Sequence, residues 1–437
     1  MNASPLPLPL PLPLPPSLWA ATARPAPSTP ALDASRTADV AIVGAGFSGL
    51  SAALRLAASG ASVVVLESGE PGWGASGRNG GQVIPGLKWD PDELVAMFGP
   101  EAGEQLVRVA GGSADTLFDL VETHGIDCEA KRCGWIQPTF ADADNALAAR
   151  RVAQWQRRGA PVELLDRETA CRLVGSPIYR GGWIDRRAGS VQPLSYARGL
   201  ARAALAAGVV VCGNSPVTGL ARSGSRWNVT TAHGPVVSAG QVLVATNGYS
   251  DDLWPHLRQS VIAANSFQVA TEPLPEALLR TVLPEGQVAS DTRKLLLYYR
   301  ANHDGRLIMG GRGTFREPTD PSEFGHLESV IGLVFPQLKG IRCAFRWSGR
   351  VALTRDHLPH VHRPAPGLTI LLGYNGRGVG LATTLGTLVA AHLASPDDHP
   401  LPLPLTGIAP IPLHSLHRIY ATAILQMYRL CDYIAVR

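Results

Sequence analysis

Residues 40–56, VAIVGAGFSGLSAALRL, constrain the fold more than any other segment, because three glycines stand where a strand should pass into a helix. The apolar, β-branched run before them is typical of a buried parallel strand. Gly44, Gly46 and Gly49 have the G-x-G-x-x-G spacing, which permits a tight turn, approach of a pyrophosphate and close packing of the helix on the strand. The segment therefore predicts a Rossmann-like α/β unit with a dinucleotide at the helix N-terminus.

A second strand, ASVVVLE, ends on Glu67, about 20 residues after Gly46. An acid at this place accepts hydrogen bonds from ribose hydroxyls, and it disfavours the 2′-phosphate of NADP. The first unit alone leaves both NAD and the ADP half of FAD possible. It predicts a dinucleotide site without deciding which cofactor occupies it.

A second glycine-rich loop, SGEPGWGASGRNGGQV, follows the acid directly, and a nicotinamide-binding fold does not require it. Three later segments also carry glycines at a strand end or turn: GVVVCGNSPVTGL, GQVLVATNGYS and LTILLGYNGRGVGLATTLGTLVAAHL. In this order the segments resemble the D-amino-acid-oxidase-type FAD-dependent oxidoreductases, a superfamily that includes glycine and sarcosine oxidases. The resemblance runs from about residue 35 to about residue 393.

The resemblance implies FAD as the cofactor, held by residues from every one of these segments. The implied set is Gly44, Gly46, Phe47, Ser48, Gly49, Glu67, Ser68, Ala75, Ser76, Arg78, Asn79, Gly80, Gly81, Gln82, Val217, Ala245, Thr246, Asn247, Gly248, Gly349, Gly376, Arg377, Gly378, Val379 and Gly380. The last five would open a helix whose N-terminus stabilises negative charge on the N1–C2=O edge of a reduced flavin.

The fold implied is an α/β, Rossmann-like FAD-binding domain with an interleaved, sheet-rich α+β substrate domain. Residues 37–90, 186–255 and 345–395 are expected to form the flavin domain, and residues 91–185 and 256–344 the substrate domain. Residues 1–36 begin with alternating proline and leucine and lack the positive start of a secretory signal. We expect them to be a disordered or polyproline-like leader. Residues 396–437 are expected to be a tail with a short amphipathic helix on the protein's own surface.

Several motifs narrow the resemblance to the gamma-glutamylputrescine oxidase branch: GASGRNGGQ, SDTRKLLLYYR, DGRLIMGGRGTF, FRWSGRVALTRDHLP and GYNGRGVG. This branch implies oxidation of a C–N bond in a small amine or amino acid derivative to an imine, by hydride transfer to flavin N5, followed by hydrolysis to an aldehyde. Two alternatives stay open. One is a flavin dehydrogenase of a non-amine substrate, and the other is the flavoprotein subunit of a larger complex.

The chemistry needs little from side chains, since the flavin accepts the hydride, and no acid–base residue stands out. Catalytic candidates are Arg312, Tyr298 and Trp347, with Tyr299 and Phe315 also in segments expected to line the substrate pocket. An aromatic pocket would disfavour the ammonium form of the amine, which must be neutral to lose a hydride. Arg312 and Arg300 are candidates for holding a substrate carboxylate.

Two positions depart from the sarcosine oxidase relatives. Gly349 stands where those proteins attach flavin to a cysteine, so we expect non-covalent FAD. The strand RLIMGG lacks a lysine that is thought to assist oxygen in those relatives, so the electron acceptor, O₂ or a carrier, stays open.

Composition and residue spacing argue against nucleic-acid-binding, metal-binding and membrane-spanning proteins. A formal net charge of +4, with 17% charged residues, argues against a protein built to hold nucleic acid. The six cysteines form no C-x-x-C pair, and no apolar run approaches the roughly 18 residues of a membrane span. His357, His360 and His362 lie close together, but their spacing lacks the fixed face of a helical metal site. We expect no metal, no nucleic-acid or membrane partner, and a cytoplasmic location.

Overall fold

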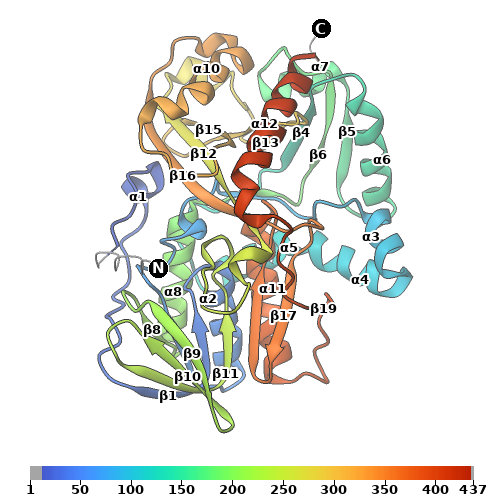
Figure 1. Cartoon of the computed structure of the whole chain (residues 1–437). Coiled ribbons are helices and arrows are strands. Elements are labelled where there is room, and N and C mark those ends of the chain that lie inside the picture. The colour runs from blue at the N-terminus through green and yellow to red at the C-terminus, as the bar shows by residue number, and fades with distance from the viewer. Residues whose placement is uncertain (1–11, 435–437) are drawn as a thin grey trace.

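The structure, a computed structural model, describes residues 12–434 and arranges them in two regions, one above the other in Figure 1. The lower region is built on a nine-stranded sheet and the upper region on an eight-stranded sheet. A small two-stranded ladder joins β3 (Gln82–Val83) to β7 (Gly189–Ser190). The expected combination of a Rossmann-like domain with a sheet-rich second region is confirmed.

The nine-stranded sheet has the glycine segment near its centre. Its main path is β19 (Leu405–Thr406), β17 (His360–Ala365), β18 (Leu368–Leu372), β11 (Val236–Val244), β1 (Arg36–Val43), β2 (Val63–Leu66) and β8 (Val210–Cys212), and β10 (Arg226–Thr231) and β9 (Val217–Ser223) continue from β11. Strands β18, β11, β1, β2 and β8 pair in parallel. Their carboxyl ends therefore share one edge of the sheet, which is where ligands bind in such folds.

Helices α2 (Phe47–Ala58) and α11 (Gly378–Ala394) pack against each other beside this sheet. A Cβ atom at Gly386 would overlap the carbonyl oxygen of Ser48, so the glycine allows the two helices to approach closely. The same apolar core receives α3 (Pro91–Phe98), α4 (Pro100–Gly111), α5 (Ser113–Thr123) and α8 (Pro193–Ala206). Because this core also contains upper-sheet residues such as Trp135 and Trp183, sharing it does not assign α3–α5 to either region, and the expected domain limit at residue 91 stays a prediction.

The eight-stranded sheet runs in the order β16 (Cys343–Leu353), β12 (Ile262–Thr271), β15 (Leu307–Arg312), β14 (Tyr298–Ala301), β13 (Val288–Ser290), β4 (Trp135–Thr139), β6 (Gly181–Asp185) and β5 (Val162–Leu165). Its helices are α6 (Asp144–Gln156), α7 (Arg167–Val174), α9 (Glu276–Leu279) and α10 (Gly325–Val334). The expected limit at residue 345 falls inside β16, which pairs with β12 over most of its length. This strand belongs to the upper sheet, so the limit lies after it.

The described part of the leader is ordered, contrary to expectation. Residues 18–22 form α1 (Leu18–Thr22), with Ser17 as its N-cap, and the side chains of Leu18 and Trp19 are fully buried. The indole nitrogen of Trp19 donates to the carbonyl oxygen of Asn79 at 2.7 Å. Proline alternation is a local signal, whereas the order of this segment comes from a tertiary contact. The Pro/Leu repeat before residue 12 lies outside the described residues.

The C-terminal tail contains α12 (His417–Ile434), which is longer than the short helix expected and crosses the front of the molecule in Figure 1. The Asp432 carboxylate accepts hydrogen bonds from the backbone nitrogens of Lys294 and Leu295, at 2.8 and 2.9 Å. Ile419 and Leu430 on α12 are exposed. Within residues 12–434 no helix is both long and apolar enough to cross a bilayer.

Candidate active site

A cavity of about 1220 Å³ lies where the two regions meet. Its walls come from the ends of β1 and β2, the start of α2, residues 72–80, the turn before α11, and strands of the upper sheet. Pockets for a single small ligand are usually about 300–1,000 Å³. This cavity therefore has room for a dinucleotide and a substrate together.

The glycine turn forms one end of the cavity. Gly44 has a φ of +105°, which disfavours a side chain, and a Cβ there would lie 3.1 Å from the carbonyl oxygen of Ala245. A Cβ at Gly49 would overlap the carbonyl oxygen of Gly44, so this glycine lets α2 pack on the strand. Gly46 is the N-cap of α2 and offers no side chain to the first turn. The helix N-terminus is therefore available to an anion from the cavity.

Glu67 stands at the end of β2 and lines the same end of the cavity. Its carboxylate accepts hydrogen bonds from the backbone nitrogens of Ala45 at 2.8 Å and Gly69 at 3.0 Å. Burial raises the pKa of Glu67, and these backbone donors oppose that rise. Glu67 thus stabilises the glycine turn through its backbone donors. The hydrogen bonds that Glu67 is expected to accept from ribose hydroxyls remain a prediction.

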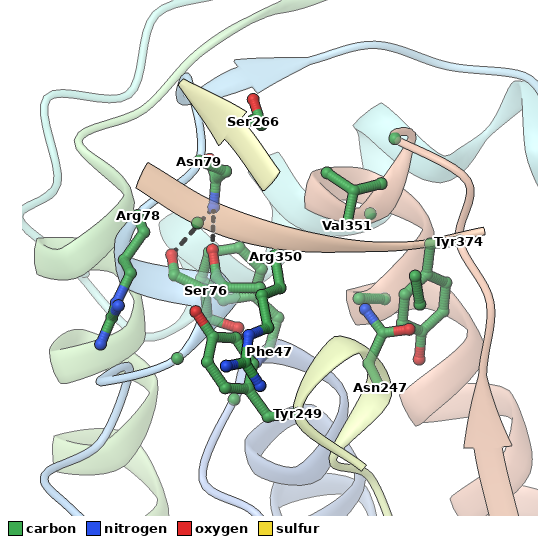
Figure 2. Close-up of a pocket in the computed structure, with 18 of the residues that line it drawn as sticks. Phe47, Ser76, Arg78, Asn79, Asn247, Tyr249, Ser266, Arg350, Val351 and Tyr374 are labelled. Atoms are coloured by element: carbon green, nitrogen blue, oxygen red, sulfur yellow. Dashed lines mark hydrogen bonds between the residues drawn. The ribbon is translucent and has the colours of Figure 1, made fainter. Parts of the chain in front are cut away.

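The second glycine loop is held by its own side chains and by α2, as Figure 2 shows. The Asn79 amide nitrogen donates to the carbonyl oxygens of Ala75 at 3.1 Å and Ser76 at 2.9 Å. The Ser76 hydroxyl accepts from the backbone nitrogen of Phe47 at 3.0 Å. Arg78 stacks on the Trp73 ring, 4.2 Å from its centroid. The loop is therefore a fixed wall of the cavity.

The N-terminus of α11 forms the wall beside the upper sheet. The Tyr374 hydroxyl lies 2.5 Å from the Ser48 hydroxyl, which ties the turn before α11 to the start of α2. Arg377 is the N-cap, and its guanidinium lies over the Trp135 ring at 4.7 Å. Its Nη1 atom is buried without a hydrogen-bond partner in the described structure, and burial lowers the pKa of Arg377 to about 10.

Most of the cofactor residues expected from sequence line this one cavity: Gly44, Gly46, Phe47, Ser48, Glu67, Ser68, Ala75, Ser76, Arg78, Asn79, Gly80, Gln82, Val217, Ala245, Thr246, Asn247, Gly349, Gly376, Arg377, Gly378 and Val379. Gly49, Gly81, Gly248 and Gly380 lie behind its walls. A Cβ at Gly380, for example, would lie 3.0 Å from the carbonyl oxygen of Ser113. These glycines allow segments to pack closely.

Two of the catalytic candidates, Tyr298 and Arg312, line the cavity from β14 and β15. The Tyr298 hydroxyl bonds to the Ser266 hydroxyl, and burial raises the pKa of Tyr298 to about 12. Arg312 reaches into the cavity, and the surrounding protein lowers the pKa of its guanidinium by desolvation. Both groups can therefore meet a substrate from the side of the upper sheet.

The other aromatic and arginine candidates lie elsewhere. Trp347 is buried against Trp19, with ring centroids 5.8 Å apart, and does not line the cavity. Arg300 is also buried and donates to the carbonyl oxygens of Gly81 at 3.1 Å and Val191 at 3.0 Å, so it braces the glycine loop. The remaining two are Tyr299, whose hydroxyl donates to the Tyr179 hydroxyl, and Phe315, whose ring meets that of His417. Sequence spacing could not show which way these side chains point.

The rings of His360 and His362 lie edge to face with centroids 5.3 Å apart, but each has its own hydrogen-bond partner. The Nε2 atom of His360 lies 3.0 Å from the Asp356 carboxylate, and the Nδ1 atom of His362 lies 2.9 Å from the carbonyl oxygen of Thr406. His357 lines the cavity. Among the described residues, no group of three or more histidine, cysteine or acidic side chains has an arrangement suited to a metal ion.

Sequence reasoning missed three parts of the cavity wall. Residues 12–16 of the leader line it, and the Trp73 indole donates to the carbonyl oxygen of Pro13 at 3.0 Å. Tyr249 lies beside Arg78 and Arg350 (Figure 2). Lys88, between β3 and α3, also faces the cavity. Lys88 lies outside the motifs quoted for the family resemblance. Its place shortly after the second glycine loop could still have indicated that it lies near the cavity.

The residues present fit an FAD molecule. The N-termini of α2 and α11 both face the cavity, and their N-cap residues, Gly46 and Arg377, make no side-chain cap hydrogen bond, although Ser76 accepts from the Phe47 nitrogen. The unpartnered Nη1 atom of Arg377 offers a donor at the second helix. A pyrophosphate at α2 and the negative edge of a flavin at α11 would satisfy both ends.

The family model for FAD-dependent oxidoreductases, DAO, matches residues 39–392. The chain belongs to the DAO family of FAD-dependent oxidoreductases. FAD is its cofactor, and it is an oxidoreductase of a family that acts on amine and amino acid donors. A DAO-family relative, gamma-glutamylputrescine oxidoreductase of Escherichia coli, is 34% identical over 380 residues, 86% of this chain and 88% of that protein. A probable oxidoreductase OrdL of Haemophilus influenzae is 32% identical over 83% of this chain and 84% of its own length.

Solved structures agree on the DAO fold. Glycine oxidase from Geobacillus kaustophilus has a TM-score of 0.69 at 23% identity, over 83% of this chain and 95% of that one. L-proline dehydrogenase from P. horikoshii has a TM-score of 0.68 at 20% identity, over 84% and 96%. At such identities the likeness establishes the DAO fold alone.

Proposed function

We propose that this DAO-family enzyme oxidises the C–N bond of an amine that carries a carboxylate, of the gamma-glutamylputrescine type. The observation that carries this proposal is the 34% identity to gamma-glutamylputrescine oxidoreductase along nearly the whole length of both chains. The neutral amine would lose a hydride, which is two electrons and one proton, and then a second proton from nitrogen to become an imine. Water would convert the imine to an aldehyde and ammonia or an amine. O₂ or a carrier would take the electrons, and a cytoplasmic location is part of the same proposal.

When bound, FAD supplies the hydride acceptor. The chain's own residues hold the substrate carbon in reach and control the charge state of the amine. Arg312 on β15 would hold the carboxylate, because a guanidinium matches the two oxygens of that group. The neutral Tyr298 hydroxyl and the apolar side chains of Leu296 and Leu353 would surround the carbon chain. A partly apolar cavity with positive charges disfavours an ammonium, so it favours the neutral amine that can lose a hydride.

An anaerobic absorption spectrum tests the function. Purified protein should be yellow, and its flavin bands should bleach on addition of gamma-glutamylputrescine. The cavity lining in the described structure includes Gly349 and no cysteine, so we expect denaturation to release the flavin into the filtrate. A yellow protein that bleaches only with hydroxy acids would overturn the amine assignment. Flavin that stays with the precipitated chain would overturn the non-covalent assignment.

Arg312 can be tested through substrate charge. In Arg312→Ala, the KM of a carboxylated amine should rise by roughly 10- to 100-fold, because a charge-assisted hydrogen bond to a carboxylate contributes about 1.5–3 kcal/mol. The KM of an amine of equal length without the carboxylate should change by less than about threefold. Steady-state kinetics on both amines give the comparison. Equal changes for both would assign Arg312 a structural role.

A further inference from the structure

The cavity wall contains a positively charged side chain, Lys88, for which the proposed function gives no role. Lys88 follows Leu87, which is buried, and precedes Trp89, whose indole donates to the carbonyl oxygen of Asp356 at 2.8 Å. The backbone on both sides of Lys88 is therefore fixed. The side chain itself lines the cavity and has neither a hydrogen bond nor an ion pair within the described residues.

The charges that act on Lys88 are all positive: Arg377 at the start of α11, Arg312 on β15 and Arg151 on α6. Of these, Arg151 has a partner, the Asp90 carboxylate at 2.7 Å. Arg312 and Arg377 have no ion pair in the described structure, and both line the cavity with Lys88. Like charges in one partly desolvated space repel one another, and an anion placed between them would relieve that repulsion.

The acidic side chains of the cavity wall are engaged elsewhere. Glu67 accepts from the glycine turn, Glu317 lies 2.9 Å from the Arg350 guanidinium, and Asp251 accepts from the backbone nitrogen of Leu253 at 3.0 Å. None of them is among the charges that act on Lys88. Asp185 and Asp90 act on Arg377, but the three acidic side chains of the cavity wall leave a place for an anionic ligand between Lys88 and Arg312.

Two anionic ligands could enter this cavity, the cofactor and the substrate. The pyrophosphate of a dinucleotide is accounted for by the glycine turn at the end of β1, and Arg377 stands at the α11 N-terminus that suits the flavin ring. Arg312 belongs to the upper sheet, away from the glycine turn, and it acts on Lys88. This arrangement favours the substrate as the ligand of Lys88 and Arg312.

We propose that Lys88 and Arg312 together form a carboxylate subsite, which makes the enzyme select amines with a remote anionic group and reject simple diamines. This inference rests on the proposed function for its substrate class and adds Lys88 as a specificity-determining residue. A second ammonium at this position would face Lys88, Arg312 and Arg377 without compensation, which is a strong repulsive element against diamines. The carboxylate end of a suitable amine would bind there and leave the nitrogen end to the flavin.

The test uses the FAD-loaded enzyme and glutarate, a dicarboxylate without an amine, so that binding is measured without turnover. Glutarate binding is followed by the change it causes in the flavin absorption spectrum and by calorimetry. Lys88→Met should weaken glutarate binding by roughly 10- to 100-fold, the loss typical of a charge-assisted hydrogen bond. Lys88→Arg should stay within about fivefold of the parent. Lys339→Met removes the same charge from an exposed site outside the cavity and should change nothing.

The pH dependence gives a second readout. The side chain of Lys88 is exposed to the open cavity. Desolvation by the cavity wall lowers its pKa to about 8, followed in size by the effects of Arg377, Arg312 and Arg151. Lys88 is charged below that pH, so glutarate should bind tightly below pH 8 and more weakly above it. Lys88→Arg should remove this dependence, because arginine stays protonated beyond pH 12. His357 and Tyr298 also line the cavity and are unchanged in that variant, so a dependence that persists in it would contradict the assignment.

Each outcome supports the subsite or overturns it. Glutaramide, the uncharged analogue, should not compete with glutarate in the parent enzyme, and equal binding of the two would overturn the proposal even if Lys88→Met failed to fold. Loss of FAD affinity with unchanged glutarate affinity would show that Lys88 holds the cofactor instead. Glutarate binding that depends on Lys88 in an enzyme that oxidises no amine would keep the subsite and refute the proposed function. Amine oxidation with glutarate binding indifferent to Lys88 would do the reverse.

Discussion

Gly49→Ala is expected to yield a protein that contains little or no flavin. The added Cβ would overlap the carbonyl oxygen of Gly44, a backbone atom of the turn itself, so no side-chain rotation can relieve the clash. Overpacking of this kind typically costs about 1–3 kcal/mol. Here α2 would have to move away from β1, and that movement displaces the helix N-terminus from the phosphate site. The flavin-to-protein absorbance ratio of the purified variant measures the effect.

Gly325→Ala is the matched control. Gly325 is the first residue of α10, has an ordinary helical backbone and has open space around the position of a Cβ. Alanine stabilises a helix relative to glycine by roughly 1 kcal/mol. This variant should therefore hold its flavin and have a slightly higher urea concentration at its unfolding midpoint. Full flavin content in Gly49→Ala would show that α2 can shift without harm, and the close-packing argument for the third glycine would then be wrong.

Trp19→Ala should produce the largest loss of stability of any single change in the described leader. The ring is fully buried against Trp347, and its indole nitrogen holds the carbonyl oxygen of Asn79 in the second glycine loop. Replacing a buried tryptophan by alanine costs about 3–5 kcal/mol. Because Asn79 lies on the cavity wall, the urea concentration at which flavin is released should fall together with the unfolding midpoint.

Trp19→Phe separates packing from the hydrogen bond. It keeps an aromatic ring beside Trp347 but cannot donate to Asn79, and loss of a single hydrogen bond costs about 1–3 kcal/mol when the acceptor stays buried. Its midpoint should therefore fall between those of the parent and Trp19→Ala. If flavin release in Trp19→Ala matched the parent, the leader would have no part in holding the second glycine loop.

The sequence predicted the parts of the site that depend on local backbone geometry. Gly44, Gly46 and Glu67 could be placed because a strand, a turn and an acid follow one another at fixed spacing, and the structure puts all three at one end of the cavity. The direction in which side chains point could not be predicted in the same way. Tyr298 and Arg312 face the cavity, but Trp347 and Arg300 turn into the core, and alternation along a strand does not reveal which face lies beside the ligand.

Features that depend on contacts between distant segments could not be predicted. The leader was expected to be disordered or polyproline-like because proline and leucine alternate, whereas Trp19 is held by contacts with Asn79 and Trp347, which lie far along the chain. Lys88 resembles any surface lysine until β15 and α11 bring Arg312 and Arg377 towards it. The limit at residue 345 failed for a similar reason, since only pairing with β12 shows that β16 belongs to the upper sheet.

The long pairing of β12 with β16 has a mechanical consequence. Val261, which directly precedes β12, and Ala352 on β16 are buried in the core of the lower region. The two regions are therefore joined beside the cavity by a pair of hydrogen-bonded strands. Paired strands that run from one region into the other resist rotation of the two regions against each other. Substrate exchange would then depend on small neighbouring segments, such as the loop at residues 293–297 that Asp432 ties to α12, rather than on opening of whole domains.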